Sequence, residues 1–229
     1  KFVLADGTDL DWEKLKSVTS LAVHFLDNVV QTNPYTLKQI YDEVHKNRRI
    51  GLGVMGFADM LFKLKIPYNS PEALELAGKL MKFINEEGHK MSEELADLRG
   101  SFPNWASSIY AERHSSVFKN RPESVAYVGG KKIRNSTITT IAPTGTISII
   151  GDCSSGIEPV FALAYIHKAK ARGDQYRILT IANQTFVDTA KKEGFYTEDL
   201  AALVLEHGSV AGLAGVPEDY QKVFVTAQE

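Results

Sequence analysis

The stretch from Asn135 to Pro159 constrains the fold more than any other part of the chain. Residues 136–142 are mostly β-branched and carry no charge, which predicts a buried strand. Pro143 has no backbone N–H to give to a strand ladder, so the strand should end there. A short helix is predicted next, from the apolar residues Ile147, Ile149 and Ile150. A buried strand that leads through a tight turn into a helix indicates an α/β protein.

The turn after Pro143 has the chemistry of an anion site. A helix that restarts after the break leaves several backbone N–H groups without partners inside the helix. Gly145 lets an oxygen-rich ligand approach the backbone, and Thr144, Thr146 and Ser148 add hydroxyl donors. This pattern predicts a phosphate site at a helix N-terminus. An ordinary turn capped by Thr144 or Thr146 is the alternative, whereas a Walker A loop is excluded because no Gly-Lys-Ser/Thr sequence follows.

Composition argues against several other classes of function. The chain has 229 residues, of which 44% are hydrophobic, and this is enough for one sizeable core or a large piece of a bigger one. The net charge of −2 gives no electrostatic argument for binding nucleic acid or an anionic membrane. No apolar run approaches the length of a membrane span. We therefore expect neither a nucleic-acid nor a membrane partner.

The cysteine content and the N-terminal sequence bear on the compartment. Cys153 is the single cysteine, so the sequence allows neither an internal disulfide nor a thiol-based metal cluster. His24 and His45 have no partner at ligand spacing, and we expect no metal site. The first residues lack the layout of a signal peptide, and we predict a cytoplasmic protein. Because the sequence does not begin with Met, we expect a trimmed or excerpted chain.

Hydrophobic periodicity predicts a chain made mostly of helices. Apolar residues recur at three- and four-residue spacing over 11–30, and a shorter helix is expected over 36–45. Ser70 and Pro71 predict the start of a long helix that Gly100 ends. The remaining segments are predicted as a helix over 107–118, a surface connection over 120–132, a strand over 160–169, a turn over 170–174, helix or mixed structure over 176–191, a helix from 197 to 208, a helical turn over 218–222 and a strand over 223–226.

Gly51, Gly53 and Gly56 match the spacing of a dinucleotide-binding loop. That fingerprint requires a strand immediately before it, yet residues 42–49 are charged and typical of a helix. No strand with an acidic end follows at the required distance. We interpret the three glycines as a smooth packing patch on a helix that continues through Phe57.

Five stretches carry a family resemblance, above all the Ala-Pro-Thr-Gly-Thr-Ile-Ser sequence of residues 142–148 and the segment 151–159 that follows it. The others are residues 47–59, 100–105 and 217–227. Together, and in the same order along the chain, they resemble the catalytic large subunit of ribonucleotide reductases, most closely the adenosylcobalamin-dependent class II branch. In that family the first segment cradles the phosphates of the ribonucleotide substrate. The resemblance therefore implies a substrate phosphate site formed by Pro143, Thr144, Gly145, Thr146 and Ile147, with Ser148 as a weaker candidate.

The resemblance also implies a fold and partners. The family has a ten-stranded α/β barrel, and residues 1–229 are similar to a single C-terminal portion of it that lacks the finger loop. We therefore expect a helix-rich, partial α/β barrel. A partial barrel exposes sheet edges and apolar helix faces. This predicts association with a missing N-terminal half of the reductase, or self-association.

The implied chemistry needs more thiols than the chain has. In the family a thiyl radical and two further cysteines reduce the ribose, whereas only Cys153 is present. The resemblance thus implies no catalytic residue here, no turnover by the chain alone, and adenosylcobalamin only in the complete enzyme. Glu158 receives no role. A class I large subunit, a standalone nucleotide-binding module and a structural half from a split gene stay open as alternatives, as does a di- or triphosphate substrate.

Overall fold

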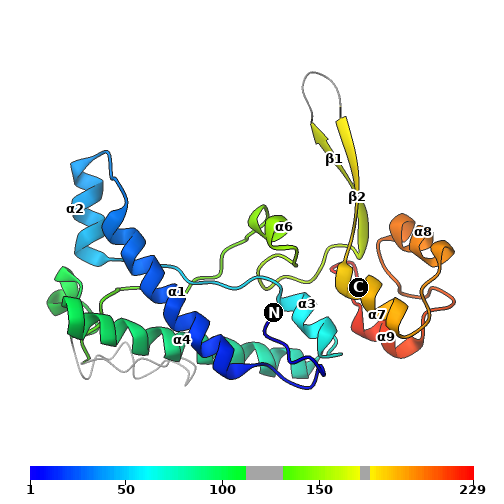
Figure 1. Ribbon diagram of the computed structural model, residues 1–229, viewed down its shortest axis with the longest axis horizontal. Coiled ribbons are helices and arrows are strands. Elements are labelled where there is room, and N and C mark those ends of the chain that lie inside the picture. The colour runs from blue at the N-terminus through cyan, green and yellow to red at the C-terminus, as the bar shows by residue number, and fades with distance from the viewer. Residues whose placement is uncertain (112–130, 171–175) are drawn as a thin grey trace. The chain divides into compact units, whose positions relative to one another are not determined.

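A computed structural model describes residues 1–111, 131–170 and 176–229, which form two compact units. Unit 1 comprises Lys1–Phe2, Leu10–Gly53 and Glu75–Ile141, and unit 2 comprises Val3–Asp9, Val54–Leu74 and Ala142–Glu229. The elements are α1 (Trp12–Thr32), α2 (Lys38–Asn47), α3 (Phe57–Lys63), α4 (Pro71–Arg99), the 3₁₀ helix η1 (Pro103–Ser107), α6 (Ile147–Gly151), β1 (Ala164–Lys170), β2 (Tyr176–Ala182), α7 (Gln184–Lys192), α8 (Glu198–His207) and α9 (Glu218–Val223) (Figure 1). The described part of the chain is therefore rich in helix, as predicted. None of its helices is long and apolar enough to cross a bilayer.

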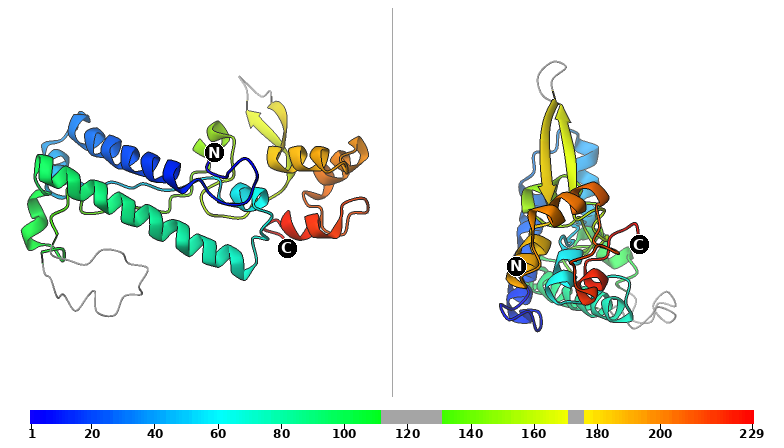
Figure 2. Two further views of the ribbon diagram at one scale, coloured as in Figure 1. Left: turned by 60° about the horizontal axis from the view of Figure 1, so that its bottom comes forward. Right: turned by 90° about the vertical axis from the view of Figure 1, so that its right-hand side faces the viewer.

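Two helices, α1 and α4, dominate unit 1 and run side by side in the same direction (Figures 1 and 2). Near the start of α1, the ring of Trp12 meets that of Phe83 edge-on at 5.0 Å. Near the ends of both helices, Asp27 pairs with Arg99. The long helix predicted from its end signals is confirmed as α4. The Ala73 N–H donates to the Ser70 hydroxyl at 3.2 Å, and Gly100 follows the helix with a φ of 81°.

Two extended segments of unit 1, residues 50–52 and 137–140, pair in parallel. The Ile50 N–H donates to the Thr137 carbonyl at 3.1 Å, the Leu52 N–H donates to Ile138 at 2.7 Å, and Thr140 donates back to Leu52 at 2.9 Å. Their apolar side chains join those of α1 and α4 in one core. Helix α4 comes between the two segments in sequence, so the arrangement is of the β-α-β kind.

The predicted strand over 136–142 is thus present only as a short paired stretch, and glycines of its partner segment lie close against Thr140. A side-chain carbon added at Gly53 would lie 2.9 Å from the Thr140 carbonyl oxygen, closer than such atoms pack. The prediction of a packing patch at these glycines is confirmed. Their predicted helical placement is wrong, because α3 starts only at Phe57, after Gly56 has turned the chain with a φ of 77°.

Unit 2 has its own apolar core. The Phe224 ring lies 4.8 Å from Phe62 and 5.2 Å from Phe186, so this core joins α3, α7 and the segment after α9. The helix from 197 is confirmed as α8, with Thr197 as N-cap and Gly208 at its end. The strand predicted over 223–226 is wrong. Helix α9 runs through Val223, and Phe224 turns inward and is fully buried.

The named strands of the described chain form one antiparallel hairpin in unit 2. Strand β1 pairs with β2 from Ala164 opposite Ala182 to Lys170 opposite Tyr176. Residues 176–191, predicted as helix or mixed structure, divide into β2 and α7 at Asn183. The predicted turn over 170–174 falls almost wholly outside the described residues, as do most of the helix predicted over 107–118 and of the connection over 120–132. A closed barrel is not seen in the described residues.

Candidate functional site: the turn over residues 143–148

The predicted phosphate turn has an unusual backbone conformation at Thr144. Its φ is 53°, in the left-handed region that a β-branched residue rarely adopts. Such a conformation costs about 1–3 kcal/mol and persists only where the surroundings enforce it. Here the Gly156 N–H donates to the Thr144 hydroxyl oxygen at 2.7 Å. The turn is therefore held in a strained shape by a neighbouring loop of unit 2.

Four consecutive backbone N–H groups in this turn make no hydrogen bond to any described residue. They belong to Thr144, Gly145, Thr146 and Ile147, whereas the Ser148 N–H donates to the Thr144 carbonyl at 3.0 Å. Gly145 is exposed, and a carbon added there would meet no atom within 4 Å. Successive N–H groups at a change of backbone handedness, from Thr144 to the right-handed Thr146, suit an anion. Pro143, also exposed, has no N–H to offer.

The hydroxyl groups of the turn have different roles. Thr146 occupies the N-cap position of α6, as the alternative of an ordinary turn predicted, but its side chain makes no capping hydrogen bond to the helix. Ser148 is 3% exposed, and its hydroxyl donates to the Gly145 carbonyl at 3.2 Å and lies 3.0 Å from the hydroxyl of Ser155. Its side chain therefore fixes the turn from the inside. Thr146, in contrast, is exposed.

The loop over residues 153–156 backs the turn. It lies in the segment 151–159 that carries part of the family resemblance, but its contacts with the turn were not predicted from the sequence. The Cys153 N–H donates to the Ser148 carbonyl at 3.1 Å, and the Cys153 side chain packs 3.3 Å from where a carbon added at Gly56 would lie. Cys153 is thus a half-buried packing residue. Gly156 has a φ of 45°, and a side chain there would collide with Glu158 and the Ala142 carbonyl. Only glycine fits this position.

Asp59 of α3 connects this loop to the rest of unit 2. One carboxylate oxygen accepts from the Ser154 N–H at 2.6 Å, and the other accepts from the Asn183 side-chain amide at 2.6 Å. The Ser154 carbonyl in turn accepts from the Gly56 N–H, just before α3. Sequence reasoning missed Asp59. The signal was a carboxylate in the first turn of a short helix that is apolar apart from Asp59 and Lys63.

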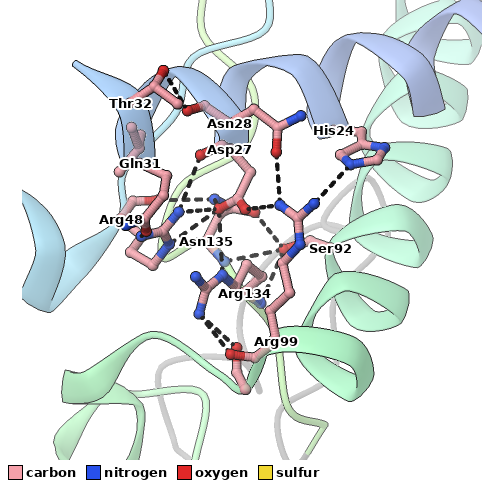
Figure 3. A network of polar contacts seen from close by, with 12 residues as sticks. His24, Asp27, Asn28, Gln31, Thr32, Arg48, Ser92, Arg99, Arg134 and Asn135 are labelled. Atoms are coloured by element: carbon pink, nitrogen blue, oxygen red, sulfur yellow. Dashed lines mark hydrogen bonds and ion pairs between the residues drawn. The ribbon is translucent and has the colours of Figure 1, made fainter.

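Unit 1 contains a second polar cluster, centred on Asp27 (Figure 3). Asp27 is fully buried, and Arg48 donates to its Oδ1 through Nε at 3.0 Å and Nη2 at 2.7 Å. The Asn135 amide donates to the same oxygen at 3.1 Å, while Arg99 donates to Oδ2 at 3.0 Å. Arg134 completes the cluster with its Nε 3.4 Å from Oδ1.

One carboxylate thus faces three guanidinium groups. Backbone carbonyls offset more of the positive charge. Arg134 donates to the carbonyls of Arg99 and Gly100 at the end of α4, and Arg48 donates to that of Asp27 within α1. Burial by itself raises the pKa of Asp27, but hydrogen bonds and charge from Arg48, with Asn135 and Arg134, outweigh burial and hold that pKa below its ordinary value. The cluster cross-links α1, α4 and the starts of both paired segments.

Ionisable groups near the loop after the turn are few. Tyr68 donates its hydroxyl to the Ile157 carbonyl at 2.9 Å, and its pKa is raised by burial and by the negative charge of Glu158. Glu158 itself is exposed. Within the described residues, no group of three or more His, Cys, Asp or Glu side chains is arranged to hold a metal ion.

The described residues combine a long helix, one parallel bridge between extended segments and a backbone turn, while the named strands β1 and β2 form a single antiparallel hairpin. The family described as "Ribonucleotide reductase, barrel domain" matches residues 1–229. The chain therefore belongs to the ribonucleotide reductase barrel-domain family, and the resemblance inferred from the sequence is confirmed.

Relatives and a solved structure agree with this assignment. The chain is 44% identical over 229 residues to a vitamin B12-dependent ribonucleoside-diphosphate reductase of Thermoplasma acidophilum, covering 100% of this chain and 27% of that protein. It is 37% identical over 227 residues to the enzyme of the same name from Mycobacterium tuberculosis, covering 99% and 30%. The class Id ribonucleotide reductase alpha subunit of Actinobacillus ureae superposes with a TM-score of 0.65 at 24% identity, covering 91% of this chain and 34% of that one. The chain spans less than a third of the length of these curated relatives.

Proposed function

We propose that this chain binds the phosphates of a ribonucleotide and contributes that site to the reduction of ribonucleotides to deoxyribonucleotides. The observation that carries the proposal is the row of unused N–H groups from Thr144 to Ile147, held in place by Gly156. Backbone N–H groups that converge on one point bind phosphate oxygens by charge-assisted hydrogen bonds. The names of the relatives, which are ribonucleoside-diphosphate reductases, favour a diphosphate over a triphosphate.

Reduction itself requires groups beyond those of this chain. Replacing C–OH by C–H consumes two electrons, and two thiols that supply them become a disulfide. A third thiol is needed to carry the radical, yet Cys153 is the single cysteine and it packs against Gly56. We therefore propose that the chain alone does not turn over, and that a further part of the reductase brings the cysteines.

The cofactor of the complete enzyme follows from the relatives. Two of them are named vitamin B12-dependent, so we propose that the enzyme to which this chain contributes uses cobalamin, in its adenosyl form, as its radical source. We propose that the role of this chain within that enzyme is to bind the substrate.

The site can be tested by titrating the ¹⁵N-labelled protein with ADP and with inorganic pyrophosphate. Both ligands should shift the amide signals of Thr144 to Ile147. Gly145→Val should weaken binding by about tenfold or more, because it blocks charge-assisted hydrogen bonds without meeting another side chain. Gly78→Ala in α4 is the matched control, since a carbon added there also meets no atom within 4 Å. Equal affinities for Gly145→Val and wild type would contradict the proposal.

A standalone nucleotide-binding module is the second candidate, and the single cysteine favours it. The split enzyme and the binding module differ in whether a segment with the missing cysteines brings reductase activity. We propose that a split enzyme makes deoxyribonucleotide once a segment with the missing cysteines, adenosylcobalamin and a dithiol are supplied. A module binds the same nucleotide but never turns over.

A further inference from the structure

Asp59 uses both of its carboxylate oxygens to join two separate segments of unit 2. Oδ2 accepts from the Ser154 backbone and Oδ1 accepts from the Asn183 side chain, each at 2.6 Å. The Asp59 N–H also donates to the Ser154 hydroxyl at 3.4 Å. Ser154 is thus contacted by the carboxylate and by the backbone of the same residue, which fixes its position against α3.

Ser154 lies at the centre of the loop that holds the phosphate turn. Cys153, before it, donates to the Ser148 carbonyl. Ser155, after it, hydrogen-bonds the Ser148 hydroxyl, and Gly156 donates to the Thr144 hydroxyl. Each of these hydrogen bonds from the loop to the turn therefore comes from a residue within two positions of Ser154.

Thr144 makes this support necessary. A β-branched residue in the left-handed region relaxes unless its surroundings enforce that conformation. The enforcing hydrogen bond comes from Gly156, whose own position depends on the loop that Asp59 anchors. A shift of this loop that breaks the bond from Gly156 would release Thr144 from the left-handed region and change the directions of the neighbouring N–H groups.

We infer that Asp59 is a positioning residue for the phosphate turn. Through Ser154 it holds the loop over 153–156 so that the N–H groups of residues 144–147 are preorganised for the phosphates of a ribonucleotide. This inference rests on the proposed function of the turn. The benefit of preorganisation is that the ligand need not order the turn when it binds.

The pair Asp59 and Asn183 allows a sharp test by exchange of side chains. In Asp59→Asn the amide nitrogen faces either the Ser154 N–H or the Asn183 amide, so a donor meets a donor. The double variant Asp59→Asn/Asn183→Asp restores both bonds, because the amide introduced at position 59 accepts from Ser154 and donates to the carboxylate introduced at position 183. That carboxylate also keeps the cap of α7, since the Asn183 oxygen of the wild type accepts from the Phe186 N–H at 2.9 Å.

Three measurements on these variants decide whether Asp59 positions the turn: the affinity for ADP, the melting temperature and the amide signals of the free protein. Affinity for ADP should fall about tenfold in Asp59→Asn, as expected for one lost charge-assisted hydrogen bond, and should recover in the double variant. Asn183→Ala is the control for stability. It removes the cap of α7 but leaves the bond from Asp59 to Ser154, so it should lower the melting temperature without changing the affinity. The amide signals of residues 144–147 in the free protein should move in Asp59→Asn alone.

Distinct results would overturn the inference and the proposed function. If Asp59→Asn lowers the melting temperature while its affinity and the free-state signals of the turn stay unchanged, Asp59 is only structural. If wild type binds neither ADP nor pyrophosphate, the proposed function fails, and the free-state amide signals still decide whether Asp59 positions the turn. Failure of the double variant to restore those signals would also count against the inference.

Discussion

Replacing Asp27 with asparagine should destabilise unit 1 strongly. The change keeps the size of the side chain but removes the single negative charge that faces Arg48, Arg99 and Arg134. The Arg48 side chain is only 3% exposed, so it cannot turn to water when its partner is neutralised. Removing one partner of a buried ion pair costs about 3–5 kcal/mol. We expect a loss in this range for Asp27→Asn.

The exposure of the three arginines predicts a graded series of costs. Arg48→Met should cost nearly as much as Asp27→Asn, because it leaves a buried carboxylate with weaker partners. Arg99→Met should cost below about 1 kcal/mol, since the Arg99 side chain is 37% exposed and its bond to Asp27 is open to solvent screening. The double variant Asp27→Asn/Arg48→Met should cost clearly less than the sum of the two single changes, because the two side chains share one interaction.

Urea unfolding followed by tryptophan fluorescence measures these costs. Both tryptophans, Trp12 and Trp105, belong to unit 1, and Trp12 packs on α4, so the fluorescence signal reports the unfolding of this unit.

The pH dependence of the free energy of unfolding is a second test. The pKa of Asp27 is lowered in the folded state, so its contribution is complete above the unfolded pKa of about 4 and is lost as pH falls through the folded value. Asp27→Asn should abolish this loss in acid.

One result would refute this reasoning. If Asp27→Asn costs less than about 1 kcal/mol and leaves the acid dependence unchanged, the helix-end carbonyls of Arg99 and Gly100 already compensate the arginines. The carboxylate would then be dispensable, and the cluster would be held by its neutral acceptors.

Two further predictions follow from packing and from electron counting. Gly53→Ala should cost about 1–3 kcal/mol in the same unfolding assay, because the added carbon meets the Thr140 carbonyl, whereas Gly78→Ala should cost nothing. The chain alone, given adenosylcobalamin, a dithiol and a ribonucleotide, should form no deoxyribonucleotide by chromatography, and a segment carrying the missing cysteines should restore product. Product from the chain alone would show that one cysteine suffices.

Local signals predicted the helices well because their ends are encoded by neighbouring residues. Ser70, Pro71 and Gly100 mark the bounds of α4, and Thr197 and Gly208 do the same for α8. The extended segments were harder, because pairing between distant residues decides them. Gly51 and Gly53 are extended because Thr140, which is distant in sequence, lies against them. Strand β2 is defined by its pairing with β1, and no pattern within residues 176–182 indicates that pairing.

The candidate site was predictable only in part, for the same reason. The turn itself is a local pattern, and residues 143–148 could be named from it and from the family. Asp59 and Ser154 are separated by 95 positions, so no local pattern connects them. Asp27 did leave a signal, since it falls on the stripe of α1 formed by Thr19, Val23 and Val30. A carboxylate on a buried helix face requires a partner, but the sequence does not say which one.

The members of the Asp27 cluster are far apart in sequence, and this has a consequence for folding during synthesis. Asp27 and Asn135 are separated by 108 residues, so ribosomes have to synthesise most of unit 1 before this carboxylate can meet all its partners. Until then, burying α1 against α4 would leave the acid incompletely compensated, at a high cost in free energy. We therefore expect unit 1 to reach its final packing late in synthesis, around contacts that are distant in sequence. A nascent chain stalled before Arg134 should accordingly be a substrate for chaperones.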